Sequence, residues 1–292
     1  MRLIHLTDPH LTSLDALRPG LGAGKRWLSW MSWMGRRRER HREHRLAALT
    51  RHLKTTEPDA WAITGDLCQI GLEQEAVEAA RWLAELAPPE RTLLVPGNHD
   101  IFARDSLATI PRYWAEHLHV DPDSPTWPVV CHFGDVALIG LNSAVVTPVL
   151  RASGRVGREM RDRLGEALDA HRGFCRVVLI HHPPAPGVCK RRKALTDDSE
   201  VSELMVEHGA AMVLHGHLHH NREYSMAARG GNPLPVFCTA SASANGRQGA
   251  AAARIFDIES NAGGYRIGMR LEALDGRNRA HTIEKREWNS AG

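Results

Sequence analysis

Short apolar runs alternate with helix-like patterns along most of the chain. Each run is bounded by glycine or polar residues, which is typical of buried strands, and apolar positions recur every three or four residues between the runs. The predicted strands are Leu3–Thr7, Asp59–Thr64, Arg91–Val95, Val136–Leu141, Arg176–Ile180 and Ala211–Leu214. The predicted helices are Leu46–Leu53, Leu72–Leu86, Arg158–Ala170 and Glu200–His208.

After Tyr224 the apolar runs follow one another without helical segments between them. They predict the strands Pro235–Thr239, Ala253–Ile258 and Tyr265–Leu271. Alternating strands and helices favour a mainly parallel sheet covered by helices, and the β-rich part at about 224–292 favours a second, more mixed sheet. We therefore expect an α/β fold, a two-sheet sandwich flanked by helices, in a single domain over residues 1–292.

The composition is that of a globular protein, with 42% hydrophobic and 24% charged residues. No run reaches the roughly 18 apolar residues of a membrane span. The N-terminal segment contains His5 and Asp8 too early for a secretory signal, and the five scattered cysteines contain no C-x-x-C pair. These features suit a reducing compartment, so we expect a cytoplasmic protein.

The net charge of +3 belongs to one segment of the chain. Lys25 to Arg45 contains eight Lys or Arg and two Glu, a local charge of +6, which leaves 29 basic against 32 acidic residues elsewhere. Because the basic charge is local, the overall balance does not indicate a specific nucleic-acid partner.

Five short polar clusters follow predicted strands. They are Asp8-Pro9-His10, Gly65-Asp66, Gly97-Asn98-His99-Asp100, His181-His182 and Gly216-His217-Leu218-His219. Open α/β sheets bind ligands beyond the carboxyl ends of their strands, so the clusters are expected to converge in one cleft. Each cluster alone is common in loops, but their joint occurrence in this order indicates a functional site.

The residue types in these clusters are those of a metal centre. Imidazole and carboxylate groups together bind Zn, Fe or Mn, and two-metal sites hold their ions about 3.5–4 Å apart. A shared carboxylate can bridge ions at that separation. The sequence therefore predicts two divalent transition-metal ions, with Mn, Fe and Zn all compatible.

The ordered set D-x-H, G-D, G-N-H-D, H and G-H-x-H resembles the calcineurin-like metallophosphoesterase superfamily. The motifs extend from Asp8 to His219, about three-quarters of the chain. The resemblance implies a four-layer αββα sandwich of two mixed β-sheets flanked by helices, which agrees with the pattern-based expectation.

The resemblance also implies roles for individual residues. The implied metal ligands are Asp8, His10, Asp66, Asn98, His181, His217 and His219. Asp66 would bridge the two ions, with Asp8, His10 and His219 on the first ion and the others on the second. His99 resembles the catalytic histidine on the leaving-group side. The choice of His181 over the neighbouring His182 rests on the family pattern alone.

The implied reaction is hydrolysis of a phosphodiester or pyrophosphate bond through attack by a metal-bound hydroxide. The expected substrate is a phosphorylated small molecule or a nucleotide. One alternative is a peripheral-membrane pyrophosphatase that cleaves a nucleotide–lipid substrate at the inner face of the membrane. Another is a non-catalytic metal-binding scaffold on the same fold, which predicts lost ligands, and none of the motif positions is lost.

A Trp- and Arg-rich insertion occupies about 15–45, and it is not explained by the motifs. In a helix, Trp27, Trp30, Met31 and Met34 would share one face. This face could pack on the catalytic domain, or it could form an amphipathic cap that meets an anionic membrane or a lipid-like substrate. Single-stranded nucleic acid stacking on the tryptophans is a further interpretation.

A second basic run follows the His181-His182 cluster and contains Arg191, Arg192 and Lys193. Such runs are often solvated loops, but this one leaves a predicted ligand-bearing strand end. We therefore expect these three residues to hold a distal phosphate of the substrate. The remaining histidines, among them His41, His44, His117 and His171, are expected to be surface residues.

Overall fold

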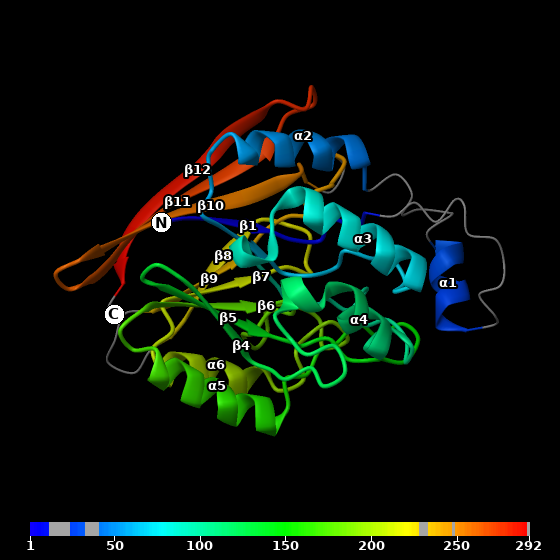
Figure 1. Ribbon diagram of the computed structural model, residues 1–292, viewed down its shortest axis with the longest axis horizontal. Coiled ribbons are helices and arrows are strands. Elements are labelled where there is room, and N and C mark those ends of the chain that lie inside the picture. The colour runs from blue at the N-terminus through cyan, green and yellow to red at the C-terminus, as the bar shows by residue number, and fades with distance from the viewer. Residues whose placement is uncertain (12–23, 33–40, 228–232, 247–248, 291–292) are drawn as a thin grey trace.

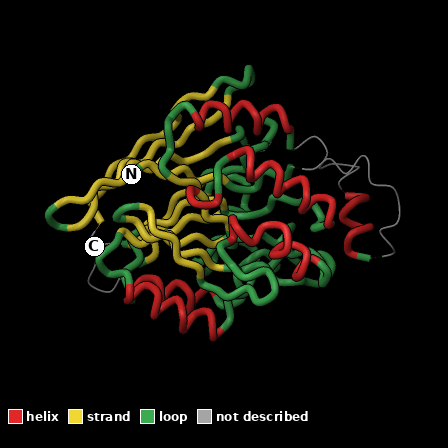
Figure 2. The backbone as a smooth tube through the Cα atoms, in the orientation of Figure 1, coloured by secondary structure: helices red, strands yellow, loops and turns green. Residues whose placement is uncertain are grey.

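Two six-stranded β-sheets lie at the centre of the protein, with helices on both outer sides (Figures 1 and 2). The computed structural model describes residues 1–11, 24–32, 41–227, 233–246 and 249–290. Helices, strands and loops are distinguished by colour in Figure 2, where the strands of both sheets fill the space between the helices.

The first sheet has the strand order β12-β11-β10-β1-β2-β3. Its strands are β1 (Arg2–Leu6), β2 (Ala60–Ile63), β3 (Thr92–Leu94), β10 (Ala252–Asn261), β11 (Gly264–Leu274) and β12 (Ala280–Ser290). Strands β1, β2 and β3 are parallel, whereas β10, β11 and β12 form an antiparallel meander attached to β1. Helices α2 (Glu43–Lys54), α3 (Glu73–Leu86) and α4 (Ser106–Leu118) lie on its outer side (Figure 1).

The second sheet has the strand order β4-β5-β6-β7-β9-β8. Its strands are β4 (Val129–Phe133), β5 (Val136–Leu141), β6 (Cys175–Ile180), β7 (Met212–His215), β8 (Arg222–Met226) and β9 (Leu234–Cys238). The four inner strands are parallel, and the edge strands β4 and β8 are antiparallel to their neighbours. Helices α5 (Arg158–Ala170) and α6 (Asp198–Glu207) lie on its outer side (Figure 1).

Strand β6 shows how the sequence builds these layers. Val177 and Leu179 belong to the large core shared with the first sheet, whereas Val178 and Ile180 pack in a second core that includes Leu164 of α5. Successive side chains of a strand point to opposite faces, so a strand that is buried on both faces reads as a continuous apolar run. The four layers are therefore held by one large core, which extends from the space between the sheets to α2, α3 and α4, and by a second core beneath α5 and α6.

The expected α/β sandwich of two mixed sheets flanked by helices is confirmed. Every strand and helix predicted from the sequence overlaps an observed element. Helix α4, the short 3₁₀ helix η3 (Pro89–Arg91) and strands β4, β8 and β12 were not predicted. Helix α4 contains Pro111, which interrupts the usual helical signal. Strand β12 is largely exposed and rich in charge, so it lacks the alternation of a half-buried strand.

Candidate metal centre

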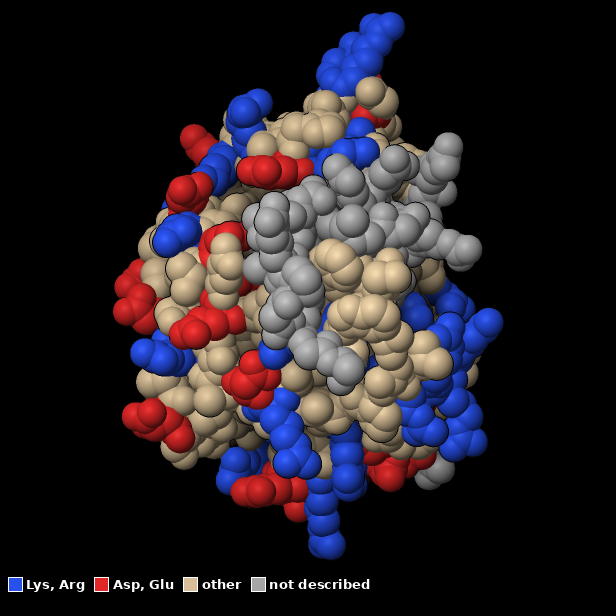
Figure 3. Space-filling model, turned by 90° about the vertical axis from the view of Figure 1, so that its right-hand side faces the viewer, with Lys and Arg blue, Asp and Glu red and all other residues tan. Residues whose placement is uncertain are grey.

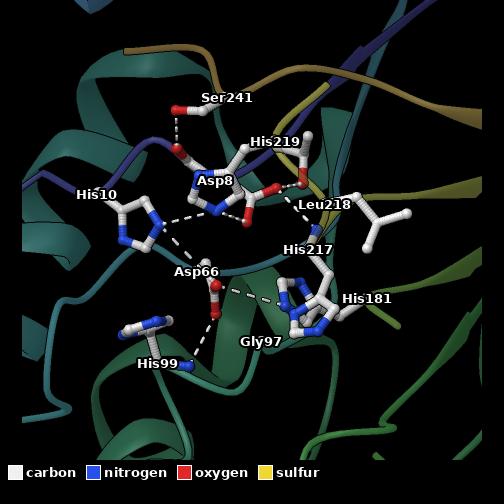
Figure 4. A network of polar contacts seen from close by, with 12 residues as sticks. Asp8, His10, Asp66, Gly97, His99, His181, His217, Leu218, His219 and Ser241 are labelled. Carbon is white, nitrogen blue, oxygen red and sulfur yellow. Dashed lines mark hydrogen bonds and ion pairs between the residues drawn. The ribbon is translucent and has the colours of Figure 1, made fainter. Parts of the chain in front are cut away.

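The five polar clusters converge at one end of the two sheets, as the strand order requires. They follow β1, β2 and β3 of the first sheet and β6 and β7 of the second. Because the strands within each set are parallel, their carboxyl ends meet at the same edge. Figure 4 shows the side chains from these different strand ends pointing toward one another.

One group of ligand-capable atoms contains Asp8, His10, Asp66 and His219, all within 4.8 Å of one another. His219 Nε2 lies 3.0 Å from Asp8 Oδ1 and 3.4 Å from His10 Nε2. Yet Asp8 Oδ1 is buried and has no hydrogen-bond partner among the described residues. The carboxylate and the two imidazoles therefore face a common point, which is the arrangement of ligands around an ion. This group matches the predicted first metal position.

The second group forms around His181. Its Nε2 lies 3.2 Å from Asn98 Oδ1 and 3.4 Å from Asp66 Oδ2. His217 joins it, since its ligand atom lies within 4.8 Å of those of His181 and His182. His217 Nε2 is buried and unpaired among the described residues. The predicted ligands of the second position are therefore together as well.

Asp66 stands between the two groups. Its Oδ2 atom is 3.4 Å from His181 Nε2 and 3.9 Å from His10 Nε2, while Oδ1 accepts a hydrogen bond from the His99 backbone N–H (2.8 Å). A carboxylate oxygen that faces one imidazole from each group has the position of a bridging ligand. Figure 4 shows Asp66 between His10 on one side and His181 on the other.

Hydrogen bonds to the backbone orient the imidazoles. His10 Nδ1 lies 3.0 Å from the Cys68 carbonyl oxygen, and His181 Nδ1 lies 2.7 Å from that of Thr64. Donation of Nδ1–H to a carbonyl leaves the Nε2 lone pair directed into the site, as is usual for metal-bound histidines. The donor set, the buried unpaired atoms and this orientation all fit Zn, Fe or Mn.

His182 lies beside His181, and its ligand atom belongs to the same group. Its Nδ1 lies 2.8 Å from Ser143 Oγ, and its Nε2 is buried without a hydrogen-bond partner among the described residues. Asn98 and Asp66 both face His181, and the choice of His181 over His182 stays a prediction from the family pattern. His182 lies beside His217, with ring centroids 4.6 Å apart.

Several predicted ligands have a left-handed backbone conformation. Nine non-glycine residues in the described ranges have positive φ, and five of them are predicted ligands. Those five are Asp8, His10, Asp66, His217 and His219, with φ between 44° and 69°. The left-handed region costs a non-glycine residue roughly 1–2 kcal/mol, so such strain persists only where surrounding contacts enforce it. Its concentration at the candidate ligands marks this region as functional.

Two glycines permit the close approach of the strand ends. A Cβ atom on Gly97 would lie 2.2 Å from Asp66 Oδ1, and one on Gly216 would lie 2.0 Å from Thr7 Oγ1. No side chain fits at either position. The glycines of the G-N-H-D and G-H-x-H motifs thus bring the carboxylates and histidines within contact of one another.

The electrostatics favour the metal-binding protonation states of His10, Asp8 and Asp66, whereas His181 carries a proton that an ion would have to displace. Burial lowers the pKa of His10 to about 3, so its imidazole is neutral. Burial opposes charge on Asp8 and Asp66, but the facing histidines hold both carboxyl pKa values below the usual range. For His181, burial alone would lower the pKa, but the Asp66 carboxylate raises it to about 9. Two buried carboxylates beside the neutral His10 form a site that attracts cations.

His99 lies at the wall of a cavity of about 180 Å³ that the two groups of ligands also line. Its Nδ1 donates to the Gln69 carbonyl oxygen, and Gln69 is fixed in turn because its N–H donates to Glu75 Oε1 (2.7 Å). The ring stacks on Phe102 with centroids 6.0 Å apart. Gln69 and Phe102 therefore hold the His99 ring at the cavity edge, and its catalytic role stays a prediction.

Asp100 has a supporting role that the sequence analysis did not assign. Its buried carboxylate accepts hydrogen bonds from the backbone N–H groups of Asp66 (2.8 Å), Gly97 (2.7 Å) and Cys68 (2.9 Å). The last residue of the G-N-H-D motif therefore ties the loop after β3 to the loop after β2. Its place in the motif was the only signal in the sequence.

His41 and His117 are not surface residues, contrary to expectation. His117 is buried in α4, where Nε2 lies 3.2 Å from the Ala87 carbonyl oxygen. His41 is half-buried and lines the cavity, with its ring centroid 4.3 Å from that of His10. Neither contact has a local sequence signal, because the partners lie 30 or more residues away.

The three residues of the basic run are divided between two cavities. Lys193 lines the cavity at the metal centre, whereas Arg191 and Arg192 line a neighbouring cavity of about 630 Å³ together with Arg151. The Ala152 N–H, on the first cavity, donates to the carbonyl oxygen of Arg192, which lines the second (2.9 Å). Only Lys193 is therefore placed beside the predicted metal ligands.

Helix α1 (Lys25–Ser32) belongs to the Trp-rich insertion and lies at the end of the molecule (Figure 1). Trp30 packs against Ile70 and Phe102, whereas Trp27 and Met31 are 41% and 49% exposed. The helix thus has one packed side and one exposed apolar side. Trp33, Met34 and Arg36–Arg38, also part of the predicted amphipathic segment, lie outside the described residues.

Comparisons with known proteins agree with this geometry. A family model described as calcineurin-like phosphoesterase matches residues 1–221. A dimetal phosphatase from Danio rerio has a similar structure, with 11% identity, 99% of each chain covered and a TM-score of 0.64. A purple acid phosphatase from yellow lupin (Lupinus luteus) seeds has 11% identity and a TM-score of 0.58, over 99% of this chain and 53% of that one.

A third similar structure is GAP50, the anchor in the inner membrane complex of Plasmodium, with 10% identity and a TM-score of 0.51 over 100% of this chain and 89% of that one. At these identities the likeness concerns the fold. No curated protein sequence matches the chain significantly. None of the helices in the described ranges combines the length and the apolar character that crossing a membrane requires.

Proposed function

Because the chain belongs to the calcineurin-like phosphoesterase family, we propose that it hydrolyses a phosphodiester or pyrophosphate bond at two divalent metal ions. One observation supports this proposal above the others: Asp66 Oδ2 lies between His10 and His181, one imidazole from each group. A site for a single ion needs no such shared carboxylate. The dimetal phosphatase and the purple acid phosphatase on the same fold agree with this chemistry.

Asp8, His10, Asp66 and His219 would hold the first ion, and Asp66, Asn98, His181 and His217 the second. When bound, two divalent ions lower the pKa of a nearby water and neutralise the charge that develops on the phosphoryl oxygens. The buried Asp8 and Asp66 carboxylates keep the site suited to cations.

His99 supplies the proton transfer. The Gln69 carbonyl oxygen holds Nδ1, so Nε2 is the atom that would exchange a proton with the departing oxygen of the substrate. Its backbone N–H donates to Asp66 Oδ1, which keeps the ring at a fixed position relative to the proposed bridge. Lys193, which lines the same cavity, would contact a substrate phosphate oxygen.

The test is an activity panel with purified protein loaded with Mn²⁺, Zn²⁺ or Fe²⁺. The panel covers phosphomonoesters, phosphodiesters and pyrophosphates, with Asp66→Ala as the control for contaminating hydrolases. We expect hydrolysis of a diester or a pyrophosphate that depends on added metal and is absent from the control. If no ester is hydrolysed with any metal, the chain is a binding scaffold, although none of its predicted ligands is missing.

A second candidate function, at a membrane surface, is favoured by the apolar face formed by α1 and the loop after β5. We define this face by its exposed residues Trp27, Leu28, Met31, Val146, Val149 and Leu150. Lys25 joins its two parts, because Nζ donates to Thr147 Oγ1 and to the Phe102 carbonyl oxygen, both at 3.1 Å.

The apolar face leads directly to the site. The loop that carries Leu150 continues into Arg151 and Ala152, and Ala152 lines the cavity at the metal centre. On the side of the molecule shown in Figure 3, Lys and Arg border a surface without charged residues. An apolar surface with a basic border suits an anionic bilayer. The substrate would then be a nucleotide–lipid pyrophosphate, and the protein would work in the cytoplasm at the inner face of the membrane.

Co-sedimentation with anionic vesicles tests this second candidate. Trp27→Ala with Met31→Ala removes exposed side chains and leaves the packed Trp30 in place. Ile283→Ala is the matched control, since Ile283 of β12 is also 49% exposed but lies outside the apolar face. We expect salt-sensitive binding that the double variant loses and the control retains. Equal binding by all three proteins would exclude the apolar face as a membrane contact.

A further inference from the structure

His41 enters the site from the Trp- and Arg-rich insertion, which the motifs do not cover. Its backbone is fixed to the segment that follows β9, through a β-bridge to Ala244 and a hydrogen bond from the Arg42 N–H to the Ser243 carbonyl oxygen (2.9 Å). The chain is therefore anchored where it returns from the insertion into α2. A histidine at such an anchor has a defined position.

Two buried serines orient the His41 ring. Its Nδ1 lies 2.9 Å from Ser243 Oγ and 3.2 Å from Ser241 Oγ. Ser241 Oγ also donates to the Asp8 backbone carbonyl oxygen at 2.6 Å, a contact shown in Figure 4. The same serine thus links His41 to the backbone of a predicted ligand. Histidines that bind metals are commonly positioned through one ring nitrogen in this way.

The ring lies against two ligands of the first position. Its centroid is 4.3 Å from that of His10 and 5.5 Å from that of His219. A ring nitrogen of each of the three histidines lies within 4.8 Å of the other two, a group separate from the one that contains Asp8 and Asp66. Nitrogen ligands stand about 2.0–2.1 Å from an ion, so two on opposite sides are about 4.2 Å apart. The three nitrogens are therefore close enough to gather around one ion.

We propose that His41 is a further imidazole ligand of the first metal position, beside His10 and His219. This inference rests on the metal-binding part of the proposed function. The four ligands predicted from the family pattern supply two imidazoles and two carboxylates at this position. A third imidazole makes the ligand set richer in nitrogen, which favours Zn, Fe or Co over Mg. The insertion would thereby set the metal preference of the site.

Metal titration of the metal-free protein tests this role without any substrate. Co²⁺ binding is followed by equilibrium dialysis and by the visible absorption of the ion, which depends on its coordination. His41→Ala is compared with His44→Ala, because His44 is an exposed histidine on the nearby helix α2. We expect His41→Ala to lower the affinity for one of the two bound Co²⁺ ions by at least about tenfold and to change the absorption of that ion. The His44→Ala control should match the wild type.

Two further variants guard against a folding defect. Ser243→Ala removes the orienting hydroxyl and should lower the affinity for the same ion by a smaller factor. His41→Asp offers a different ligand and should restore part of the affinity that His41→Ala loses. Wild-type affinity and absorption in a folded His41→Ala protein would overturn the proposal. Since no substrate is used, failure to find an activity would leave this result interpretable.

Discussion

His181 Nε2 lies 3.4 Å from Asp66 Oδ2, and both side chains are buried. Burial alone would lower the pKa of His181, but the carboxylate raises it to about 9. Without metal, a proton on His181 therefore occupies the place where the second ion would bind. The proton and the metal compete for the same nitrogen.

This competition predicts a pH dependence of metal binding. Below about pH 9, His181 is protonated in the metal-free protein, so binding at the second position must release that proton. The affinity for this equivalent should rise by about tenfold per pH unit up to that value and then level off. Calorimetry in buffers of different ionisation enthalpy measures the released proton. Binding of this equivalent without proton release between about pH 7 and 8 would contradict the assignment.

Replacing Asp66, the proposed bridging ligand, should weaken metal binding at both proposed metal positions. Asp66→Ala removes the oxygen that faces His10 and His181, so we expect loss of turnover and binding of fewer than two metal ions per chain. Elemental analysis after reloading and dialysis gives the stoichiometry. Asp162→Ala, on the exposed side of α5, is the control. A variant that still bound two ions tightly would refute the bridging role.

His99 should affect the rate without affecting the metal. His99→Ala removes the proposed proton donor but none of the predicted ligands, so turnover should fall by about 10²–10⁴-fold at unchanged metal content. The loss should be smaller for a substrate whose leaving group is already a weak base, because such a group needs little protonation. Joint loss of metal and activity would instead identify His99 as part of the metal-binding framework.

Asp100 should matter for stability as well as for activity. Its carboxylate accepts hydrogen bonds from three buried backbone N–H groups, and each group left without a partner costs about 1–3 kcal/mol. Asp100→Ala should therefore lower the free energy of unfolding by at least about 3 kcal/mol. Thermal denaturation provides the measurement, with the exposed Asp123→Ala as control. Equal melting temperatures for the two variants would show that the loop does not depend on Asp100.

Replacing Lys193 and replacing Arg191 with Arg192 should have different effects on KM. Lys193 lines the cavity at the metal centre, so Lys193→Ala should raise KM for every substrate with little change in kcat. Arg191 and Arg192 line the neighbouring cavity, so replacing both should raise KM only for substrates with a second anionic group. Steady-state kinetics on a small phosphodiester and on a nucleotide pyrophosphate separate the two. Unchanged KM in all variants would make the run a solvated loop.

The sequence predicted the fold and the convergence of the ligands because both rest on local signals. Continuous apolar runs such as Val177–Ile180 mark strands buried on both faces, and the polar clusters mark the ends of such strands. Helix α4 escaped prediction because Pro111 lies within it, and β12 because its side chains are mostly exposed. In both elements tertiary packing outweighs local propensity.

The unpredicted parts of the site depend on contacts that are distant in the sequence. His41 is about 200 residues from the serines that orient it, and the cavity wall beside Lys193 is formed with Ala152, about 40 residues earlier. No spacing rule connects such residues. The positions of Asp100, Gln69 and Glu75 likewise follow from hydrogen bonds to backbone groups, which any loop sequence could offer.

The left-handed backbone at Asp8, His10, Asp66, His217 and His219 limits how this centre could be rebuilt elsewhere. A protein engineer who grafted the seven ligand side chains onto ordinary strand ends would place them at the wrong angles. The recipient would also need the close approaches at Gly97 and Gly216 and an equivalent of Asp100 to keep the loops together. A graft would therefore have to transfer the loop conformations together with the predicted ligand residues.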